Sequence, residues 1–282
     1  MPPPKKRVAD KLTPLQLKDL YCDQGKSLVD IGKMYGCSKV YILQLMREYN
    51  IPTRNRSAAS AQAKRLEKGV RFTQVDEKFF QGRTPQMAYV LGCMYSHGRI
   101  GKHSTSFAIT HDDLELINLI KALMGSAHRI KKSKRRESYT LTIGNKNMAM
   151  DLLAFGLVPK KDVDRVFPMM EDRLYRHFIR GLFDSNGKIS IFNNVSRVSF
   201  LSTSKLFVDN LQTVIKTYAK TNCRPIYTYL PPKIYQLSYD NRPEQKKIFE
   251  FIYDDYSLDK KIYLPRQYDA FLKHVQGKWA HG

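Results

Sequence analysis

The sequence predicts an α+β protein made of two copies of one αββαββα unit, preceded by a small all-α domain. Three observations lead to this prediction. An apolar helical stretch with an interior glycine occurs twice, and its closing glycines, Gly98 and Gly187, are 89 residues apart. Strand-like and helical stretches follow each copy in the same order. Residues 12–50, by contrast, have apolar residues at helical spacing throughout.

Charge is the strongest signal in the composition. The 282 residues include 48 Lys and Arg against 26 Asp and Glu, which makes a formal net charge of +22. A surplus of this size favours a polyanionic partner over a merely soluble basic surface. It is spread along the chain, because residues up to Arg83 contribute +9 and the remainder contributes +13.

The sequence shows no feature of a membrane protein or of a zinc-binding protein. No apolar run is long enough to span a membrane and no signal-peptide pattern is present, so we expect an intracellular protein without a membrane partner. The four cysteines are isolated and form no CxxC pair, which predicts reduced, buried thiols and no zinc site.

The N-terminal part divides into an arm and a helical domain. Residues 1–11 begin Met-Pro-Pro-Pro-Lys-Lys-Arg and predict a mobile basic arm. In residues 12–52, Ser27 can cap a second helix, Gly36 ends it, and Ser38 can cap a third. The stretch from Ser27 to Ser38 resembles a helix-turn-helix of the resolvase or homeodomain-like kind, in which Gly32 would let two helices cross closely.

The third of these helices would offer side chains to the DNA major groove. Its apolar residues share one face, so the residues opposite and at its start remain available. Arginine suits guanine edges and glutamine suits adenine edges. The predicted groove residues are Lys39, Tyr41, Gln44 and Arg47. A three-helix domain for protein contacts is the alternative, and the net charge favours DNA.

Residues 53–78 are predicted to be a basic linker. They contain Arg54, Arg56 and further basic residues among Ser, Ala and Gln, with few large apolar side chains. Such a segment could follow a DNA backbone or enter a minor groove. An ordinary solvated spacer is an equally good interpretation.

The remaining chain forms the two repeats, residues 79–168 and 169–282. Each begins with the glycine-containing helix and continues with a strand pair, a helix, a second hairpin and a closing helix. In the first repeat the four later elements are predicted at residues 99–110, 114–124, 128–143 and 148–155. In the second repeat they are predicted at residues 188–202, 206–218, 224–239 and 246–253.

The two glycine-containing helices are predicted to pack on each other. Gly92 with Ser96, and Gly181 with Ser185, lie one turn apart on one helix face. An interior glycine costs about 1 kcal/mol of helix stability, so its recurrence suggests that close helix approach is the compensation. The residues before the closing glycines, His97 and Asn186, would then lie side by side at the base of this seam.

This pattern resembles the LAGLIDADG homing-endonuclease family in its single-chain, two-motif form, and the match extends over roughly residues 79–274. The resemblance implies a monomer in which two such helices form the central interface of a pseudo-twofold saddle that binds double-stranded DNA. It also implies that the last acidic residue of each motif holds the divalent metals for phosphodiester hydrolysis. Here His97 and Asn186 stand at those two positions. Asp184, earlier in the second motif, is expected to brace the helix.

Basic residues recur at corresponding places in both repeats, which favours phosphate contact over a solvated face. Arg99 follows Gly98 just as Lys188 follows Gly187, and the second hairpin of the first repeat is crowded with Lys and Arg. The predicted DNA-contacting residues of the repeats are Arg99, Arg129, Lys131, Lys132, Lys134, Arg135, Arg136, Lys188, Arg197, Arg224 and Lys233.

The two replaced acids predict weak or absent cleavage and no metal cofactor. Mg²⁺ requires hard oxygen ligands, whereas His97 offers a nitrogen and Asn186 one neutral carbonyl oxygen. Three functions remain open. The favoured one is a non-cutting DNA-binding regulator or repressor; the second is an active or nicking endonuclease that uses Mg²⁺ or Mn²⁺ with atypical ligands; the third is an RNA-binding, maturase-like protein.

Overall fold

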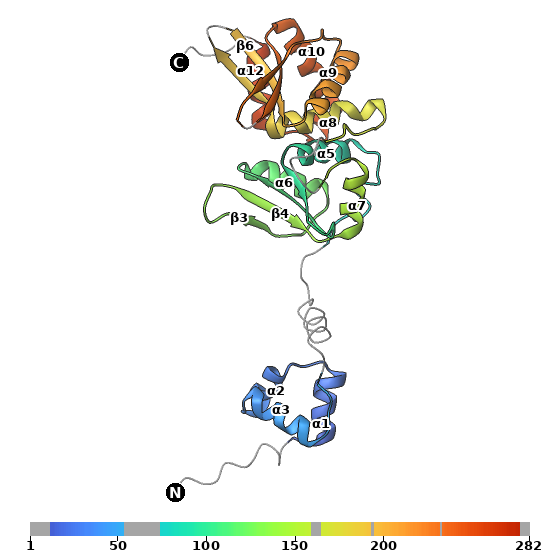
Figure 1. Ribbon diagram of the computed structural model, residues 1–282, viewed down its shortest axis with the longest axis vertical. Helices are drawn as coiled ribbons and strands as arrows, with labels where there is room; N and C mark the ends of the chain where they lie inside the picture. Colours follow the sequence, from blue (N-terminus) through green and yellow to red (C-terminus); the bar gives the residue numbers. More distant parts are fainter. Residues whose placement is uncertain (1–11, 54–73, 159–164, 193–194, 232, 277–282) are drawn as a thin grey trace. The chain divides into compact units, whose positions relative to one another are not determined.

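The computed structural model describes residues 12–53, 74–158, 165–192, 195–231 and 233–276. The chain divides into two compact units, residues 1–71 and 72–282 (Figure 1). Each has its own apolar core. We call them the helical unit and the sheet unit.

The helical unit consists of short helices whose ends are capped as the sequence predicts. Its elements are α1 (Pro14–Lys18), which continues into a π-helical turn (Asp19–Asp23), α2 (Leu28–Tyr35) and α3 (Lys39–Glu48). Ser27 Oγ accepts a hydrogen bond from the Asp30 backbone N–H at 3.1 Å, and the Asp30 carboxylate accepts in return from the Ser27 N–H. Ser38 Oγ caps α3 by accepting from the Tyr41 N–H at 3.2 Å, without a reciprocal bond.

Two glycines shape the turn between α2 and α3. Gly36 has φ = +68°, a left-handed conformation that ends α2. A Cβ on Gly32 would lie 2.6 Å from the Cys37 carbonyl oxygen, so only glycine allows this approach. The helices then bury a common core, whose fully or nearly fully buried members are Leu12, Leu17, Ile31, Ile42, Leu45 and Met46.

The sheet unit contains two four-stranded antiparallel sheets with equivalent strand orders, β1-β2-β4-β3 and β5-β6-β8-β7. The first sheet comprises β1 (Gly98–Ile100), β2 (Phe107–His111), β3 (Ile130–Lys132) and β4 (Tyr139–Ile143). The second comprises β5 (Lys188–Phe192), β6 (Val195–Ser202), β7 (Ile226–Tyr229) and β8 (Ile234–Tyr239). The predicted pair of mixed α and β repeats is confirmed.

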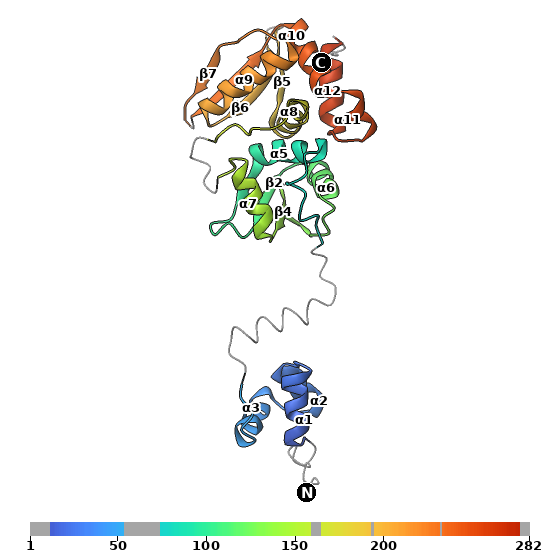
Figure 2. The ribbon, with the colours of Figure 1, turned by 90° about the vertical axis from the view of Figure 1, so that its right-hand side faces the viewer.

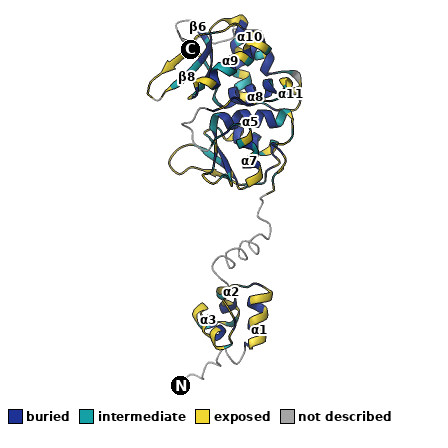
Figure 3. Ribbon diagram, turned by 45° about the vertical axis from the view of Figure 1, so that its right-hand side comes forward, coloured by how far each residue is buried: buried dark blue, intermediate teal, exposed yellow. Residues whose placement is uncertain are grey.

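Helices join the sheets in the predicted order. In the first repeat they are α5 (Pro85–His97), α6 (Leu114–Leu123) and α7 (Lys146–Ala154). In the second they are α8 (Asp172–Asn186), α9 (Lys205–Ala219) and α10 (Arg242–Ile252). Figures 1 and 2 show α5 and α8 side by side between the two sheets. Both are almost entirely buried (Figure 3).

The second repeat does not end at α10, as the sequence had suggested. Two more helices follow, α11 (Asp255–Asp259) and α12 (Pro265–Val275). A proline at the first position of α12 is a helix-start signal that could have revealed it. Its buried residue Phe271 stacks near Phe183 of α8, with ring centroids 5.0 Å apart, so α12 completes the core of this repeat.

Alternation along the strands gives the first sheet one buried face and one open face. In the first sheet Ile100, Phe107 and Leu141 are buried, and helix α6 contacts β2 and β4. Strand pairing places a second row on the opposite face. This open face carries Arg99, Thr110, Thr140, Thr142 and Lys131, with the small, buried Ala108 between them.

The cysteines differ in their exposure to solvent. Cys93 is buried and Cys37 is half-buried, but Cys22 and Cys223 are exposed, so the prediction of four buried thiols is wrong. Cys22 follows buried Leu20 and Tyr21 in a helical turn, where the next residue points away from them. Within the part of the chain that the structure describes, every helix is too short or too polar to cross a membrane.

Candidate functional site

The seam between α5 and α8 is a contact between backbones. A Cβ on Gly92 would lie 2.1 Å from the Phe178 carbonyl oxygen, and one on Gly181 would lie 2.0 Å from the Tyr89 carbonyl oxygen. Both distances are far inside van der Waals contact, so neither position has room for a side chain. The Cys93 thiol also donates to the Gly181 carbonyl across the seam, at 3.4 Å.

The two serines of the motifs have different surroundings. Ser185 is buried in α8 and its Oγ donates to the Gly181 carbonyl at 2.7 Å. Ser96 is half-buried and lines a small cavity together with Leu182 and Asn186. Small side chains at both positions leave the two helix backbones close along this stretch.

Asp184 braces α8 from inside the protein. Its carboxylate accepts hydrogen bonds from the hydroxyls of Tyr89 and Tyr253 and from the Leu264 N–H, at 2.5–2.9 Å. Burial raises the pKa of this carboxyl to about 6. All three donors belong to the fold, so the carboxylate fastens α8 to α5 and to the segment before α12.

Arg180 supports the same region one turn earlier. It is fully buried, and its guanidinium donates to the carbonyl oxygens of Ile262 and Ile252 at 2.6 and 2.7 Å. It also contacts His177 Nδ1 at 2.8 Å. Burial and the neighbouring guanidinium lower the pKa of His177 to about 3, so this imidazole is neutral. Arg180 therefore fixes the chain around α11 and is unavailable to a ligand.

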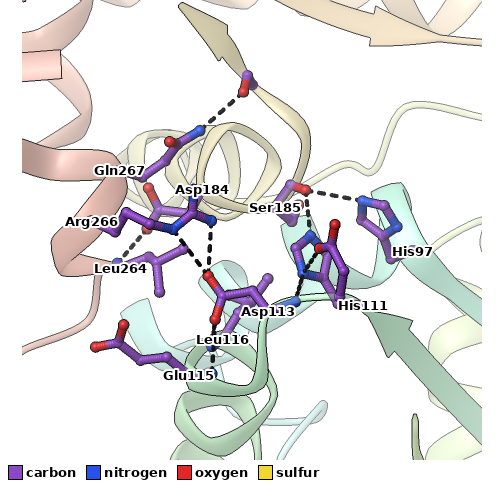
Figure 4. Close-up of polar contacts among 12 residues, drawn as sticks. His97, His111, Asp113, Glu115, Leu116, Asp184, Ser185, Leu264, Arg266 and Gln267 are labelled. Atoms are coloured by element: carbon purple, nitrogen blue, oxygen red, sulfur yellow. Dashed lines mark hydrogen bonds and ion pairs between the residues drawn. The ribbon is translucent and has the colours of Figure 1, made fainter. Parts of the chain in front are cut away.

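The base of the seam is closed by two histidines from the first repeat (Figure 4). His97 Nε2 lies 2.9 Å and His111 Nε2 lies 3.0 Å from the same acceptor, the Ser185 carbonyl oxygen. The rings meet edge to face at a centroid distance of 4.6 Å. Since a carbonyl oxygen only accepts, both imidazoles carry their proton on Nε2. His111 Nδ1 then accepts from the Asp113 N–H at 2.9 Å.

Asn186 turns away from this pair toward its own sheet. Its Nδ2 donates to the Leu201 carbonyl oxygen on β6, at 3.4 Å. Both Asn186 and His97 nevertheless line one cavity of about 820 Å³ at the base of the seam. The other polar residues around this cavity include His111, Lys188 and Arg266.

Helix α12 adds residues to this cavity that the sequence analysis missed. Arg266 forms an ion pair with Asp113, the residue that caps α6 in the first repeat, at 2.8 Å (Figure 4). Gln267 Nε2 donates to the Gly187 carbonyl oxygen at 2.9 Å. One turn of α12 therefore joins the two repeats beside the cavity.

The basic residues predicted in the first repeat are solvent-exposed. Arg99 and Lys131 belong to the open face of the first sheet, and Lys132 donates to Glu137 at 3.2 Å. The others are also exposed: Arg129 precedes β3, and Lys134, Arg135 and Arg136 lie in the β3–β4 loop.

The basic residues predicted in the second repeat are fewer and partly engaged. Lys188 and Lys233 are exposed, and Lys233 Nζ lies 5.4 Å from the centroid of the Tyr235 ring. Arg197 is half-buried. Arg224 forms ion pairs with Glu244 and Asp240, so its charge is balanced within the fold. At this end of the sheet the exposed side chains missed by the sequence analysis are Tyr227, Tyr229 and Leu230.

In the helical unit, three of the four predicted groove residues lie on the surface of α3. Lys39, Gln44 and Arg47 are exposed. Tyr41 is half-buried and packs against the core of the unit, so it is less available than the others. Arg54 and Arg56 lie outside the described residues.

A comparison of the sequence with family models identifies the second repeat. Residues 173–249 match the model described as a LAGLIDADG-like domain. The chain contains a LAGLIDADG-like domain. The match begins near the start of α8, includes the motif with Gly181, and ends within α10.

Individual proteins are similar to the chain at low sequence identity. The probable translation initiation factor IF-2 of Methanocaldococcus jannaschii is 24% identical over 199 residues, which are 65% of this chain and 16% of that protein. The chain thus spans a small part of that relative. Full-length DUF199/WhiA from Thermatoga maritima aligns with 73% of the chain and 66% of its own length, at 15% identity and a TM-score of 0.45.

Two solved protein–DNA complexes are similar to the same extent. I-DmoI in complex with DNA and Ca aligns with 71% of the chain and 99% of its own length, at 13% identity and a TM-score of 0.45. The meganuclease I-SmaMI bound to uncleavable DNA aligns with 68% of the chain and 90% of its own length, at 13% identity and a TM-score of 0.44.

The residues at the base of the seam do not fit the divalent metals expected of a LAGLIDADG endonuclease. His97 already donates to the Ser185 carbonyl, and Asn186 supplies an amide whose nitrogen is bonded to β6. Hard divalent cations need several oxygens with carboxylate charge. In the described ranges no three His, Cys, Asp or Glu side chains gather as a metal-binding group.

Proposed function

We propose that this protein binds double-stranded DNA in a sequence-specific manner on its LAGLIDADG-like scaffold, does not cut it, and acts as a transcriptional regulator or repressor. One observation carries the proposal. The two motif positions that would hold catalytic metals are His97 and Asn186, and each is hydrogen-bonded to a backbone carbonyl. His97 therefore joins the two repeats and Asn186 bonds within its own repeat, which leaves the binding surface without hydrolytic chemistry.

The first sheet supports DNA as the partner. Its open face combines Arg99 and Lys131 with threonines, and the exposed β3–β4 loop adds further Lys and Arg beside it. Positive side chains placed along one face bind a phosphate backbone and release its counterions. Threonine hydroxyls and methyl groups between them suit base edges.

The helical unit supports a second contact of a different kind. Residues 12–53 contain five basic and four acidic residues, a net charge of only +1. The sequence around the unit is far more basic: residues 1–11 contain four basic residues and one acidic residue, and residues 54–73 contain six and one. We infer that the flanking segments supply phosphate affinity and that α3 supplies base contacts.

The test is selection followed by a cleavage assay. The full chain is used to select from a random duplex library, and a supercoiled plasmid carrying the selected site is then incubated with protein and Mg²⁺ or Mn²⁺. We expect one recurring sequence and no nicked or linear plasmid. The matched variant, His97→Asp with Asn186→Asp, restores two carboxylates and should bind Mn²⁺ more tightly than the unaltered protein in calorimetry.

Two outcomes would replace this proposal with another function. Metal-dependent cleavage by the unaltered protein would mean an active or nicking endonuclease with atypical ligands. Preferential binding of structured RNA in competition with the selected duplex would mean a maturase-like role.

A further inference from the structure

The surface of α3 carries one strongly exposed apolar side chain beside its polar ones. Val40 is 65% exposed, although it is β-branched and lies in the first turn of the helix. The core residues of the same helix, Ile42, Leu45 and Met46, are almost completely buried on the other side. Val40 therefore has no packing role in the helical unit.

Val40 is aligned with two of the predicted groove residues. Val40, Gln44 and Arg47 have the spacing i, i+4 and i+7, which places them in one stripe along the helix. All three are exposed. Seven residues of helix rise about 10 Å, which is close to three base-pair steps of about 3.4 Å. The stripe can thus face three or four successive base pairs.

Each member of the stripe matches a different base edge in the major groove. The methyl groups of valine suit the 5-methyl group of thymine, the amide of glutamine suits adenine, and the guanidinium of arginine suits guanine. Gln44 Nε2 donates to Glu48 Oε1 at 3.0 Å, which orients the amide. This bond uses one of its two N–H groups, so the second N–H and the carbonyl oxygen match adenine N7 and N6.

We propose that α3 reads a thymine, an adenine and a guanine within about four successive base pairs, with Val40 against the thymine methyl group. The inference rests on the proposed DNA-binding function and names the bases that this helix recognises. It replaces half-buried Tyr41 with Val40 among the residues that contact bases.

The decisive experiment removes one methyl group from the DNA. In the duplex selected by the full chain, each thymine is replaced in turn by deoxyuridine, and dissociation constants are measured. At one thymine we expect binding to weaken about fourfold, the effect of one buried methyl group. The Val40→Ala variant should bind thymine and uridine at that position equally.

A matched control separates this contact from any effect on the fold. Val29→Ala makes the same change on α2, where the side chain is 45% exposed, and should keep the full preference for thymine. Library selection with Gln44→Ala and with Arg47→Ala should each erase the preference at one neighbouring position. Circular dichroism checks that all variants keep their helix content.

The outcomes distinguish this inference from the proposed function. If Val40→Ala discriminates thymine from uridine as well as the unaltered chain does, the inference is wrong while sequence-specific binding stands. If the unaltered chain selects no sequence, the proposed function itself fails.

Discussion

The two motif helices, α5 and α8, are held in place at the same motif position by a hydrogen-bond donor in one helix and by an acceptor in the other. Tyr95 and Asp184 occupy corresponding positions, three residues after Gly92 and Gly181. The Tyr95 hydroxyl hydrogen-bonds to the Phe155 and Val166 carbonyls, beyond α7 of its own repeat. Asp184 instead accepts from donors that include Tyr253 and Leu264, beyond α10. The position serves to hold the motif helix against the segment that ends its repeat, and either a donor or an acceptor can do this.

The base of the seam shows a second difference between the repeats. His111 on β2 and Ser202 on β6 each accept from the backbone N–H of the residue two positions later, just before α6 or α9 begins. Only the histidine is long enough to reach the opposite repeat as well, where it meets Ser185. The first repeat therefore closes the junction, while the short side chains of the second bond within their own repeat.

The largest expected effect tests whether the two helices need their backbone contact. Gly181→Val should abolish cooperative folding of the sheet unit, a cost of more than about 5 kcal/mol, because its side chain would overlap the Tyr89 carbonyl. Gly144→Val is the control, since a Cβ there meets nothing within 4 Å. Urea unfolding, followed by far-ultraviolet circular dichroism, measures the stability of both variants. Similar stabilities would show that the seam can open without penalty.

Removing the Asp184 carboxylate and removing the Tyr95 hydroxyl should lower the free energy of unfolding by unequal amounts. Asp184→Ala should cost about 3–5 kcal/mol, because it leaves a fully buried guanidinium and two tyrosine hydroxyls without this carboxylate. Tyr95→Phe should cost about 1–3 kcal/mol, the penalty of unpaired backbone carbonyls. Unfolding free energies at neutral pH give both values, and equal costs would contradict the distinction between the charged and the neutral brace.

The same contrast should produce a pH dependence that belongs to the second repeat. The pKa of Asp184 is raised from 3.8 to about 6 by burial, so its contribution is complete below pH 3.8 and is lost as the pH rises through 6. The amount is about 3 kcal/mol. We expect the unfolding free energy of the unaltered protein, relative to that of Asp184→Asn, to fall by this amount between pH 4 and pH 7. A flat difference would mean an ordinary pKa.

The two basic hairpins should contribute unequally to DNA binding. Replacing Lys134, Arg135 and Arg136 together by Gln should reduce the slope of log K against log salt by up to about 2.7, since each phosphate contact contributes about 0.9. Lys233→Gln in the second repeat should reduce it by no more than about 0.9. Binding to the selected duplex over a range of salt concentrations measures both slopes. Equal reductions in slope would contradict the expected difference and mean that the two hairpins contribute equally to phosphate binding.

The smallest effect concerns the pair of histidines. His97→Ala should cost only about 1 kcal/mol, because His111 still donates to the Ser185 carbonyl. His103→Ala, at an exposed position outside the seam, should leave the stability unchanged. A cost of several kcal/mol at His97 would indicate that the two imidazoles act as a unit. Thermal unfolding of the three proteins decides this.

The sequence predicts local structure and the repeat well because both depend on residues that are close together along the chain. The serine caps of α2 and α3, the left-handed Gly36 and the succession of helices and strands along the chain all follow from neighbouring residues. The two motifs are recognisable because their glycines and serines recur at equal distances. These signals need no knowledge of the tertiary fold.

The features that the sequence did not predict depend on contacts between distant residues. Arg266 reaches Asp113 across 153 positions, and the amphipathic pattern of α12 does not indicate which residue its arginine will meet. His111 looks like any strand histidine until Ser185 lies beside it. Tyr41 has the position of a groove residue, but its ring packs on the core. No local spacing distinguishes these partners from their neighbours.

The ion pair between Arg266 and Asp113 has a consequence for biosynthesis. A ribosome makes α6 long before it makes α12, so the nascent first repeat must wait for about 150 further residues before Arg266 arrives. For the first part of that interval, until α8 (Asp172–Asn186) has been made, the flat side of α5 has no partner helix and is exposed to other chains and to chaperones. Assembly of the sheet unit is therefore a late event of translation, and slowing elongation within α8–α12 should lengthen the period in which the nascent chain can aggregate.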